Sequence, residues 1–123
     1  MTILIVEDEP KVLELLSIFF TSRGHRVLTS ESGEGALPLL DQKPDVLVLD
    51  MWLKGRLNGM DVMKEARRRL LSAAIVVITG LEDVPQEELA THGVTALMRK
   101  PIRLEELDLL LKQVDAGRKG TPA

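Results

Sequence analysis

Short apolar runs alternate along the chain with longer segments in which apolar residues recur three and four positions apart. Five runs have the length of strands and span about residues 2–6, 25–30, 45–49, 74–79 and 94–98. All but the second are nearly continuous apolar stretches, which is typical of strands covered on both faces. Because a segment with helical spacing follows each strand, the pattern predicts an α/β fold with a five-stranded parallel sheet and five helices.

The segments between the strands predict helices with different clarity. The first begins at Pro10, a residue suited to a first helical turn, and ends at Gly24. The second follows Ser32, but Pro38 lies inside it and is expected to kink the helix or delay its start. The other three helices are expected at about residues 59–71, 85–91 and 104–114.

Composition narrows the class of protein. The chain has 123 residues, enough for one domain with one core, and it is 45% hydrophobic and 28% charged, as soluble globular proteins are. No apolar stretch approaches the roughly 20 residues that a membrane-spanning helix needs, so no membrane span is expected. The N-terminus lacks the features of a secretory signal, and the chain has no cysteine. The expected location is therefore the cytoplasm.

The charge balance and the C-terminal residues add two expectations. A net charge of −3, from 16 basic and 19 acidic residues, argues against the broad positive field of a nonspecific nucleic-acid-binding protein. We therefore expect no direct nucleic-acid binding by this chain. Residues 117–123 are small, polar and rich in helix breakers, which predicts a flexible tail or linker stump after a domain of residues 1–116.

Polar side chains follow four of the five predicted strands: Glu7, Asp8 and Glu9 after the first, Asp50 after the third, Thr79 after the fourth and Lys100 after the fifth. Ligands bind at the carboxyl ends of the strands in open parallel sheets, so these side chains are expected to share one site. Three carboxylates brought together repel one another unless a cation lies among them. Mg²⁺ prefers oxygen ligands of this kind. The sequence thus predicts Mg²⁺ as a cofactor of Glu7, Asp8 and Asp50.

Asp50 is the candidate nucleophile of this site. Phosphoryl transfer needs an in-line nucleophile, and positive charge or hydrogen-bond donors around the phosphoryl oxygens. A carboxylate can serve as that nucleophile and then forms an aspartyl phosphate. Mg²⁺, the Lys100 ammonium and the Thr79 hydroxyl can each hold one phosphoryl oxygen. The pattern indicates a site for a covalent, hydrolysable modification.

Each feature also has a structural interpretation. Acidic residues before a helix stabilise its N-terminal dipole by about 0.3 to 1 kcal/mol each, and Asp50 alone is a common turn residue. Their joint occurrence at four strand ends favours a functional site. Residues 67–69 are three consecutive arginines, interpreted as the solvated face of the third helix or as a surface for an acidic partner.

Four segments in order, residues 3–10, 44–50, 76–80 and 99–102, resemble the receiver domain of two-component response regulators. The resemblance runs from Ile3 to about Val114. It implies a flavodoxin-like, doubly wound sheet of strand order 2-1-3-4-5. It also implies that a sensor histidine kinase or a phosphotransfer protein phosphorylates Asp50, which switches the interaction with a downstream effector that the sequence does not identify. Apart from autocatalysing its own phosphorylation and dephosphorylation, such a domain is not an enzyme.

The resemblance assigns finer roles to single residues. It implies that Asp8 and Asp50 bind Mg²⁺ directly, Glu7 binds it through water, and the backbone carbonyl of Trp52 is a further ligand. Thr79 is expected to move toward the phosphoryl group, and Lys100 is expected to pair with it, positioned by a cis peptide bond to the following proline. A phosphorylation-dependent homodimer is one further partner.

The sequence departs from the family pattern on its signalling side. The family usually has an aromatic residue three positions before the lysine, and this chain has Leu97 there. Thr79 and Leu97 are the two residues expected to change conformation on phosphorylation. The loop of residues 51–59 is one residue longer than the common form, and the stretch from Thr79 to Lys100 is about one residue shorter.

Two alternative functions stay open. One is a pseudo-receiver, an interaction or dimerisation module without the phosphorylation switch, which Leu97 and the altered loops suggest. The other is a flavin- or nucleotide-binding flavodoxin-like protein, but acidic residues 7–9 stand where such proteins place a glycine-rich, anion-binding loop.

Overall fold

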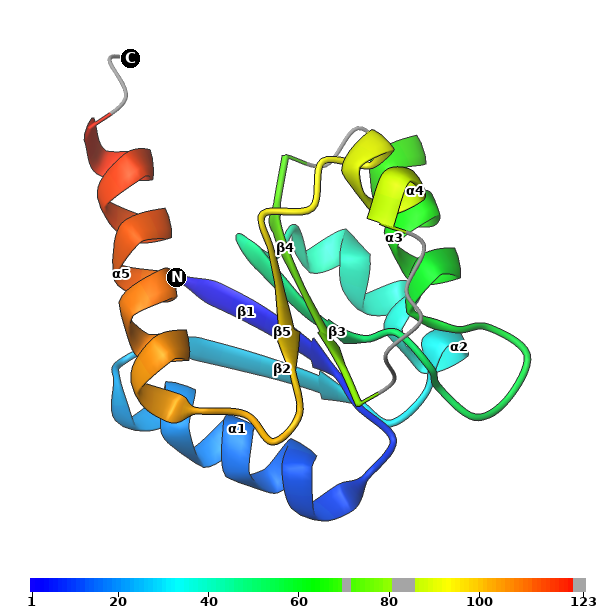
Figure 1. Cartoon of the computed structure of the whole chain (residues 1–123), viewed down its shortest axis with the longest axis horizontal. Helices are drawn as coiled ribbons and strands as arrows, with labels where there is room; N and C mark the ends of the chain where they lie inside the picture. Colours follow the sequence, from blue (N-terminus) through cyan, green and yellow to red (C-terminus); the bar gives the residue numbers. More distant parts are fainter. Residues whose placement is uncertain (70–71, 81–85, 121–123) are drawn as a thin grey trace.

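The computed structural model describes residues 1–69, 72–80 and 86–120 and shows a parallel sheet covered by helices. The sheet has the order β2-β1-β3-β4-β5 and consists of β1 (Thr2–Val6), β2 (Arg26–Ser30), β3 (Val46–Asp50), β4 (Ala74–Thr79) and β5 (Ala96–Arg99) (Figure 1). All four neighbouring pairs are parallel. The predicted fold class and strand order are confirmed.

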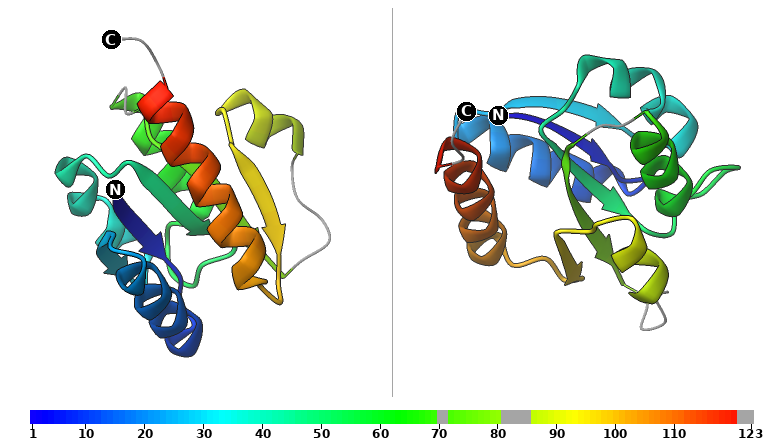
Figure 2. Two further views of the ribbon diagram at one scale, coloured as in Figure 1. Left: turned by 90° about the vertical axis from the view of Figure 1, so that its left-hand side faces the viewer. Right: turned by 90° about the horizontal axis from the view of Figure 1, so that it is seen from above.

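Helices cover both faces of this sheet. α1 (Pro10–Ser22) and α5 (Leu104–Gly120) lie on one face, and α2 (Gly33–Ala36), α3 (Gly59–Arg68) and α4 (Gln86–Thr91) lie on the other, as the right-hand view of Figure 2 shows. Alternate residues of a strand point to opposite faces. In β1, Ile3 and Ile5 therefore pack toward α1 and α5, and Leu4 and Val6 pack toward α2 and α3.

The central strand β3 is buried on both faces, which explains its continuous run of apolar residues. All five residues of Val46–Asp50 are buried, because both faces of the strand contribute to a core. Asp50 is the one charged residue in the strand and is its last residue, at the carboxyl ends of the strands. The fold thus places a carboxylate at the carboxyl end of its most buried strand.

The second helix differs from the single helix predicted after Ser32. It is split into the one-turn α2 and a 3-10 helix, η1 (Pro38–Gln42). The Ser32 hydroxyl caps α2 by accepting a hydrogen bond from the Gly35 N–H at 3.0 Å. Pro38 opens η1, because proline has no N–H to continue an α-helix and its ring obstructs the preceding turn.

The fifth helix is longer than predicted. It was expected to end near residue 114 and runs to Gly120. Once a helix is nucleated, adding residues costs little, and the polar residues here include good helix formers. Residues 121–123 lie outside the described part of the chain, so the division at residue 116 stays a prediction.

Other boundaries shift by a few residues. α3 was predicted to reach residue 71 and ends at Arg68, and residues 70–71 lie outside the described residues. The shortened stretch after β4 falls partly on residues 81–85, which are also outside them. Among the described helices, none is long and apolar enough to cross a membrane.

Two of the three arginines at the end of α3 contact neighbouring elements, whereas Arg68 is exposed, as expected of a solvated face. Arg67 donates hydrogen bonds from Nε to the carbonyl oxygen of His92 at 2.7 Å and from Nη2 to that of Gly93 at 3.3 Å. Arg69 donates from Nη1 to the carbonyl oxygen of Leu37 at 3.0 Å. The end of α3 is thereby tied both to the turn after α4 and to the start of η1.

Candidate functional site

The acidic residues predicted at the strand ends meet at one edge of the sheet. Glu7 follows β1, Asp50 ends β3, and the two strands are neighbours in the sheet. One carboxylate oxygen each from Glu7, Asp8 and Asp50 can be chosen so that all three lie within 4.8 Å of one another. The structure therefore brings the three predicted metal ligands together, although their binding of a metal stays a prediction.

We name the group of Glu7, Asp8 and Asp50 the acidic edge, and the Lys100 ammonium lies beside it. Its Nζ is 3.3 Å from Asp50 Oδ2, 3.1 Å from Glu7 Oε2 and 3.1 Å from Glu9 Oε1. The bond between Lys100 and Pro101 is a cis peptide, as the family resemblance implied. Burial lowers the pKa of Lys100. Hydrogen bonds to Glu7 and Glu9 and the charge of Asp50 raise it by more than burial lowers it, so the pKa lies above its ordinary value. Lys100 is a permanent cation of the site.

Glu7 carries the clearest sign of electrostatic stress. Its side chain is 2% exposed. Burial, together with the charge of Asp50, raises the pKa of Glu7 to about 7, although the Glu9 backbone N–H and Lys100 oppose the shift. Oε2 of Glu7 is buried and receives no hydrogen bond from the described residues, despite its ion pair with Lys100. A buried anionic oxygen without a donor is an energetic cost that a neighbouring cation or its water shell would relieve.

These observations fit a hard divalent cation. Mg²⁺ takes oxygen ligands, keeps several of its waters, and is commonly held by one or two carboxylates. Glu7, Asp8 and Asp50 provide carboxylate oxygens at short mutual distances, and within the described part of the chain no group donates a hydrogen bond to Glu7 Oε2. The donor set of the acidic edge therefore suits Mg²⁺.

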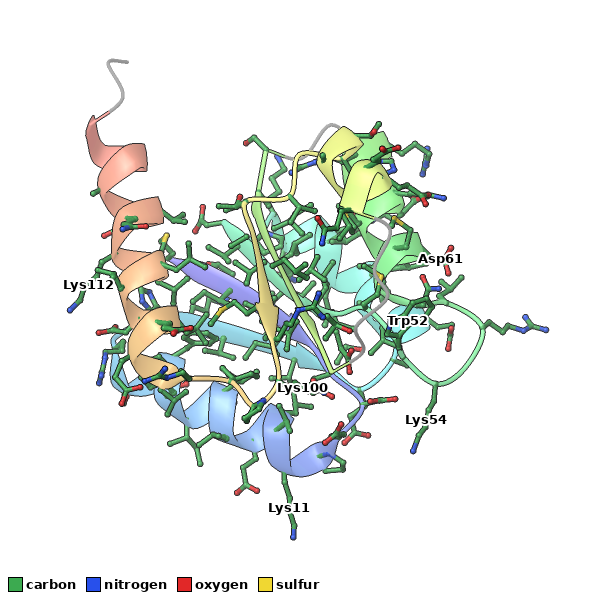
Figure 3. All side chains as sticks on the ribbon, in the orientation of Figure 1. Lys11, Trp52, Lys54, Asp61, Lys100 and Lys112 are labelled. Carbon is green, nitrogen blue, oxygen red and sulfur yellow. The ribbon has the colours of Figure 1, made fainter. Side chains whose placement is uncertain are left out.

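Backbone amides of residues 51–58, which we name the β3–α3 loop, orient two of the carboxylates. The Trp52 N–H donates to Asp50 Oδ1 at 3.1 Å, and the Lys54 N–H donates to Asp8 Oδ2 at 2.9 Å. Figure 3 shows Trp52 and Lys54 on this loop, and Lys100 just after the end of β5. The Trp52 side chain is exposed. The structure thus assigns the Trp52 N–H to Asp50, and the predicted role of its carbonyl as a metal ligand stays a prediction.

The two predicted switch residues lie on the same face of the sheet. Thr79 is fully buried at the end of β4. Leu97 in β5 pairs with Val77, two residues before Thr79. Since every second residue of a strand points to the same face, Leu97 and Thr79 share a face. Leu97 is half-buried and lines a cavity of about 280 Å³ together with Leu89 and Val94.

Sequence reasoning missed some participants. Glu9 was noted at the strand end but was not assigned to the site, although its carboxylate accepts a hydrogen bond from Lys100 at 3.1 Å. Its place in the same acidic run was a usable signal. The loop amides gave no signal, because every residue except proline carries an N–H and only the folded loop decides where it points.

Comparison with known proteins agrees with this geometry. A family model described as the response regulator receiver domain matches residues 3–112. The chain is 32% identical over 114 residues to the transcriptional regulatory protein AfsQ1 of Streptomyces coelicolor, an alignment that covers 92% of this chain and 50% of that protein. It is 31% identical over 122 residues to the transcriptional regulatory protein KdpE of Mycobacterium tuberculosis, covering 98% of this chain and 53% of that protein. The chain spans about half the length of these relatives.

Solved structures share the fold. A response regulator receiver domain protein from Clostridium thermocellum matches with a TM-score of 0.85 and 26% identity over 96% of each chain. The N-terminal domain of a protein from Wolinella succinogenes matches with a TM-score of 0.90 over 96% of each chain, but at 23% identity it supports the fold alone. The acidic edge, the family match and these structures agree: the chain belongs to the response regulator receiver domain family.

Proposed function

We propose that the chain accepts a phosphoryl group on Asp50, with Mg²⁺ bound at the acidic edge, and that this modification switches its interaction with a downstream partner. The supporting observation is the environment of the Asp50 carboxylate. It lies at the end of the central strand, one oxygen is 3.3 Å from Lys100 Nζ, and the other accepts the Trp52 N–H. The proposed donor is a sensor histidine kinase or a phosphotransfer protein.

The reaction needs one nucleophilic oxygen of Asp50. A bond forms between this oxygen and phosphorus while the P–N bond of a donor phosphohistidine breaks and its electron pair leaves with the histidine. The Trp52 N–H fixes the orientation of the carboxylate, and Lys100 places positive charge beside it. Mg²⁺, held by Glu7, Asp8 and Asp50 and by the proposed carbonyl ligand of Trp52, would offset the negative charge of the incoming phosphoryl group.

A relay from the site to the surface is supported by the shared sheet face of Thr79 and Leu97. We propose that Thr79 moves toward the phosphoryl group and that Leu97 changes its packing in response. The cavity beside Leu97 gives an aliphatic side chain room to do so. A phosphorylation-dependent homodimer and a separate effector protein are both proposed partners for this output.

The direct partners proposed for this chain are proteins, and its proposed location is the cytoplasm. A net charge of −3 disfavours nucleic acid as a direct ligand. The relatives named as transcriptional regulatory proteins are about twice as long, and this chain matches about half of each. Its own catalysis is proposed to be limited to the formation and hydrolysis of its aspartyl phosphate.

The test is phosphorylation by acetyl phosphate in the presence of Mg²⁺, followed by intact mass. The expected result is the addition of one acid- and base-labile phosphoryl group to the unmodified chain and none to Asp50→Asn. Failure of labelling with acetyl phosphate and with histidine kinases alike would refute the proposal.

The alternative of a pseudo-receiver, which has the fold without the switch, is not favoured, because Leu97 and the altered loops leave the carboxylates and Lys100 in place. A beryllofluoride titration separates the two functions, since beryllofluoride mimics the phosphoryl group. Trp52, the one tryptophan of the chain, reports binding by its fluorescence. A pseudo-receiver predicts no response, whereas the proposed function predicts a first change with Mg²⁺ and a second with beryllofluoride.

A further inference from the structure

The β3–α3 loop is held by carboxylates at both of its ends. Near its start, the Trp52 N–H donates to Asp50 at 3.1 Å and the Lys54 N–H donates to Asp8 at 2.9 Å. Near its end, the Leu57 N–H donates to Oε1 of Glu34 at 2.6 Å. Glu34 belongs to α2, a different element, and is not part of the acidic edge. The loop therefore bridges α2 and the phosphorylation site.

The loop also bends around the Glu34 carboxylate. Gly55 has a φ of +102°, and a Cβ at this position would lie 3.1 Å from Glu34 Oε2. Gly33, the residue before Glu34, packs against the same segment, since a Cβ there would lie 2.6 Å from the carbonyl oxygen of Leu57. The start of α2 and the end of the loop are thus in direct contact, and two glycines make that approach sterically feasible.

Met51 and Asn58 anchor the two ends of the loop, since Met51 is buried and bonded to Ile78 and Asn58 caps α3, but few other contacts hold the residues between them. The side chains of Trp52, Lys54 and Arg56 are exposed, and only Leu53 of the middle part packs on the core. Hydrogen bonds to an ionised acceptor are roughly twice as strong as those between neutral groups. The hydrogen bond from the Leu57 N–H to the exposed Glu34 carboxylate is therefore one restraint on residues 53–57, beside the anchors at Met51 and Asn58.

We propose that Glu34 is a positioning residue for the phosphorylation site, which holds the β3–α3 loop so that its amides orient Asp8 and Asp50. This inference rests on the proposed function. It predicts that loss of the Glu34 carboxylate disorders the loop, misorients two ligands of the metal site and weakens Mg²⁺ binding, without removing any residue that touches the ion.

The experiment compares three variants with the unmodified chain. Glu34→Ala removes the acceptor, Glu34→Gln keeps an acceptor oxygen but removes the charge, and Glu31→Ala removes a nearby exposed acidic side chain as the matched control. Mg²⁺ affinity is measured by Trp52 fluorescence. Hydrogen exchange of the amides of residues 52–57 is measured without metal, and thermal unfolding checks that each variant folds.

We expect Glu34→Ala to weaken Mg²⁺ binding about tenfold, the lower end of the effect of outer-shell partners, and to speed exchange of the Lys54 and Leu57 amides. Glu34→Gln should lie between Glu34→Ala and the unmodified chain, because a neutral acceptor binds the Leu57 N–H about half as strongly, and Glu31→Ala should match the unmodified chain. Equal losses in Glu34→Ala and Glu31→Ala would indicate a long-range charge effect and overturn the inference, as would an unchanged Glu34→Ala titration. If Mg²⁺ gave no saturable signal with the unmodified chain, the proposed function would fall as well.

Discussion

Two clusters of like charge lie at the two ends of α3, and they are built in opposite ways. At its start, beside Asp50, carboxylates converge within 4.8 Å of one another on the buried edge of the sheet. At its end, three consecutive arginines turn toward different parts of the molecule, although two of them share Glu65. Arg67 binds the turn after α4, Arg68 pairs with Glu65, and Arg69 reaches η1 as well as Glu65.

The difference distinguishes a ligand site from a structural cluster. Every guanidinium has at least one carbonyl or carboxylate oxygen beside it, and Glu65 lies between Arg68 and Arg69, so the positive charges are compensated within the protein. The carboxylates share Lys100, and one buried oxygen of Glu7 receives no hydrogen bond from the described residues. Strongly perturbed and unsatisfied groups gather at functional sites, where a ligand completes the electrostatics. The count of charges in the sequence is similar in the two places, and their geometry separates them.

Removing Lys100 tests the converging cluster and has the largest expected effect. Lys100→Met leaves Glu7 and Asp50 without their shared cation, so the rate of phosphorylation by acetyl phosphate should fall about a hundredfold, the size of losing one preorganised charge-stabilising donor. A time course by intact mass measures the rate. Lys11→Met is the matched control, because Lys11 is exposed on α1 and points away from the site in Figure 3. A rate in Lys100→Met equal to that control would contradict the role given to Lys100.

Removing Arg67 tests the diverging cluster. Arg67→Ala deletes two hydrogen bonds to backbone carbonyls at the end of α4, and the free energy of unfolding should fall by about 1 to 2 kcal/mol. Urea denaturation measures this loss, and hydrogen exchange should quicken in residues 86–94. Arg68→Ala, an exposed neighbour, should change stability by less than about 0.5 kcal/mol. The phosphorylation rate of Arg67→Ala should stay unchanged, and a slowed rate would show that the two clusters are coupled.

The smallest expected effect concerns Glu65, the carboxylate that pairs with Arg68 and Arg69. Hydrogen bonds from Arg68 and Arg69 lower its pKa from the ordinary 4.5 to about 2. A carboxyl with a lowered pKa in the folded state stabilises the fold above its unfolded pKa, and this contribution is lost as the pH falls through the folded pKa. The Tm of Glu65→Gln should therefore lie slightly below that of the unmodified chain near neutral pH, and the gap should close between about pH 4.5 and 2. Glu14→Gln, on the exposed face of α1, is the control. A gap that widened toward acid would contradict this pairing.

The hydrophobic pattern of the sequence predicted secondary structure best in segments made almost entirely of apolar residues. Continuous apolar runs located β1, β3 and β4 closely, because strands buried on both faces have little choice of composition. Prediction was poorer for η1 and for the end of α5. Pro38 marked a disturbance but not its form, and the polar residues after Val114 read as a tail although the helix continues to Gly120.

The sequence by itself determined the parallel sheet, and with it the meeting of Glu7, Asp8, Asp50 and Lys100, because residues that end parallel strands share one edge whatever the details of the helices. Only the tertiary structure decided which partners these and other charges take. It placed Glu9 on Lys100, the loop amides on Asp8 and Asp50, and Glu34 behind that loop. It also placed Arg67 on the turn after α4 and Arg69 on η1, and left Arg68 paired within α3. The physical reason is that burial is encoded residue by residue, whereas a hydrogen bond depends on two groups, often far apart in sequence, that folding brings within about 3 Å.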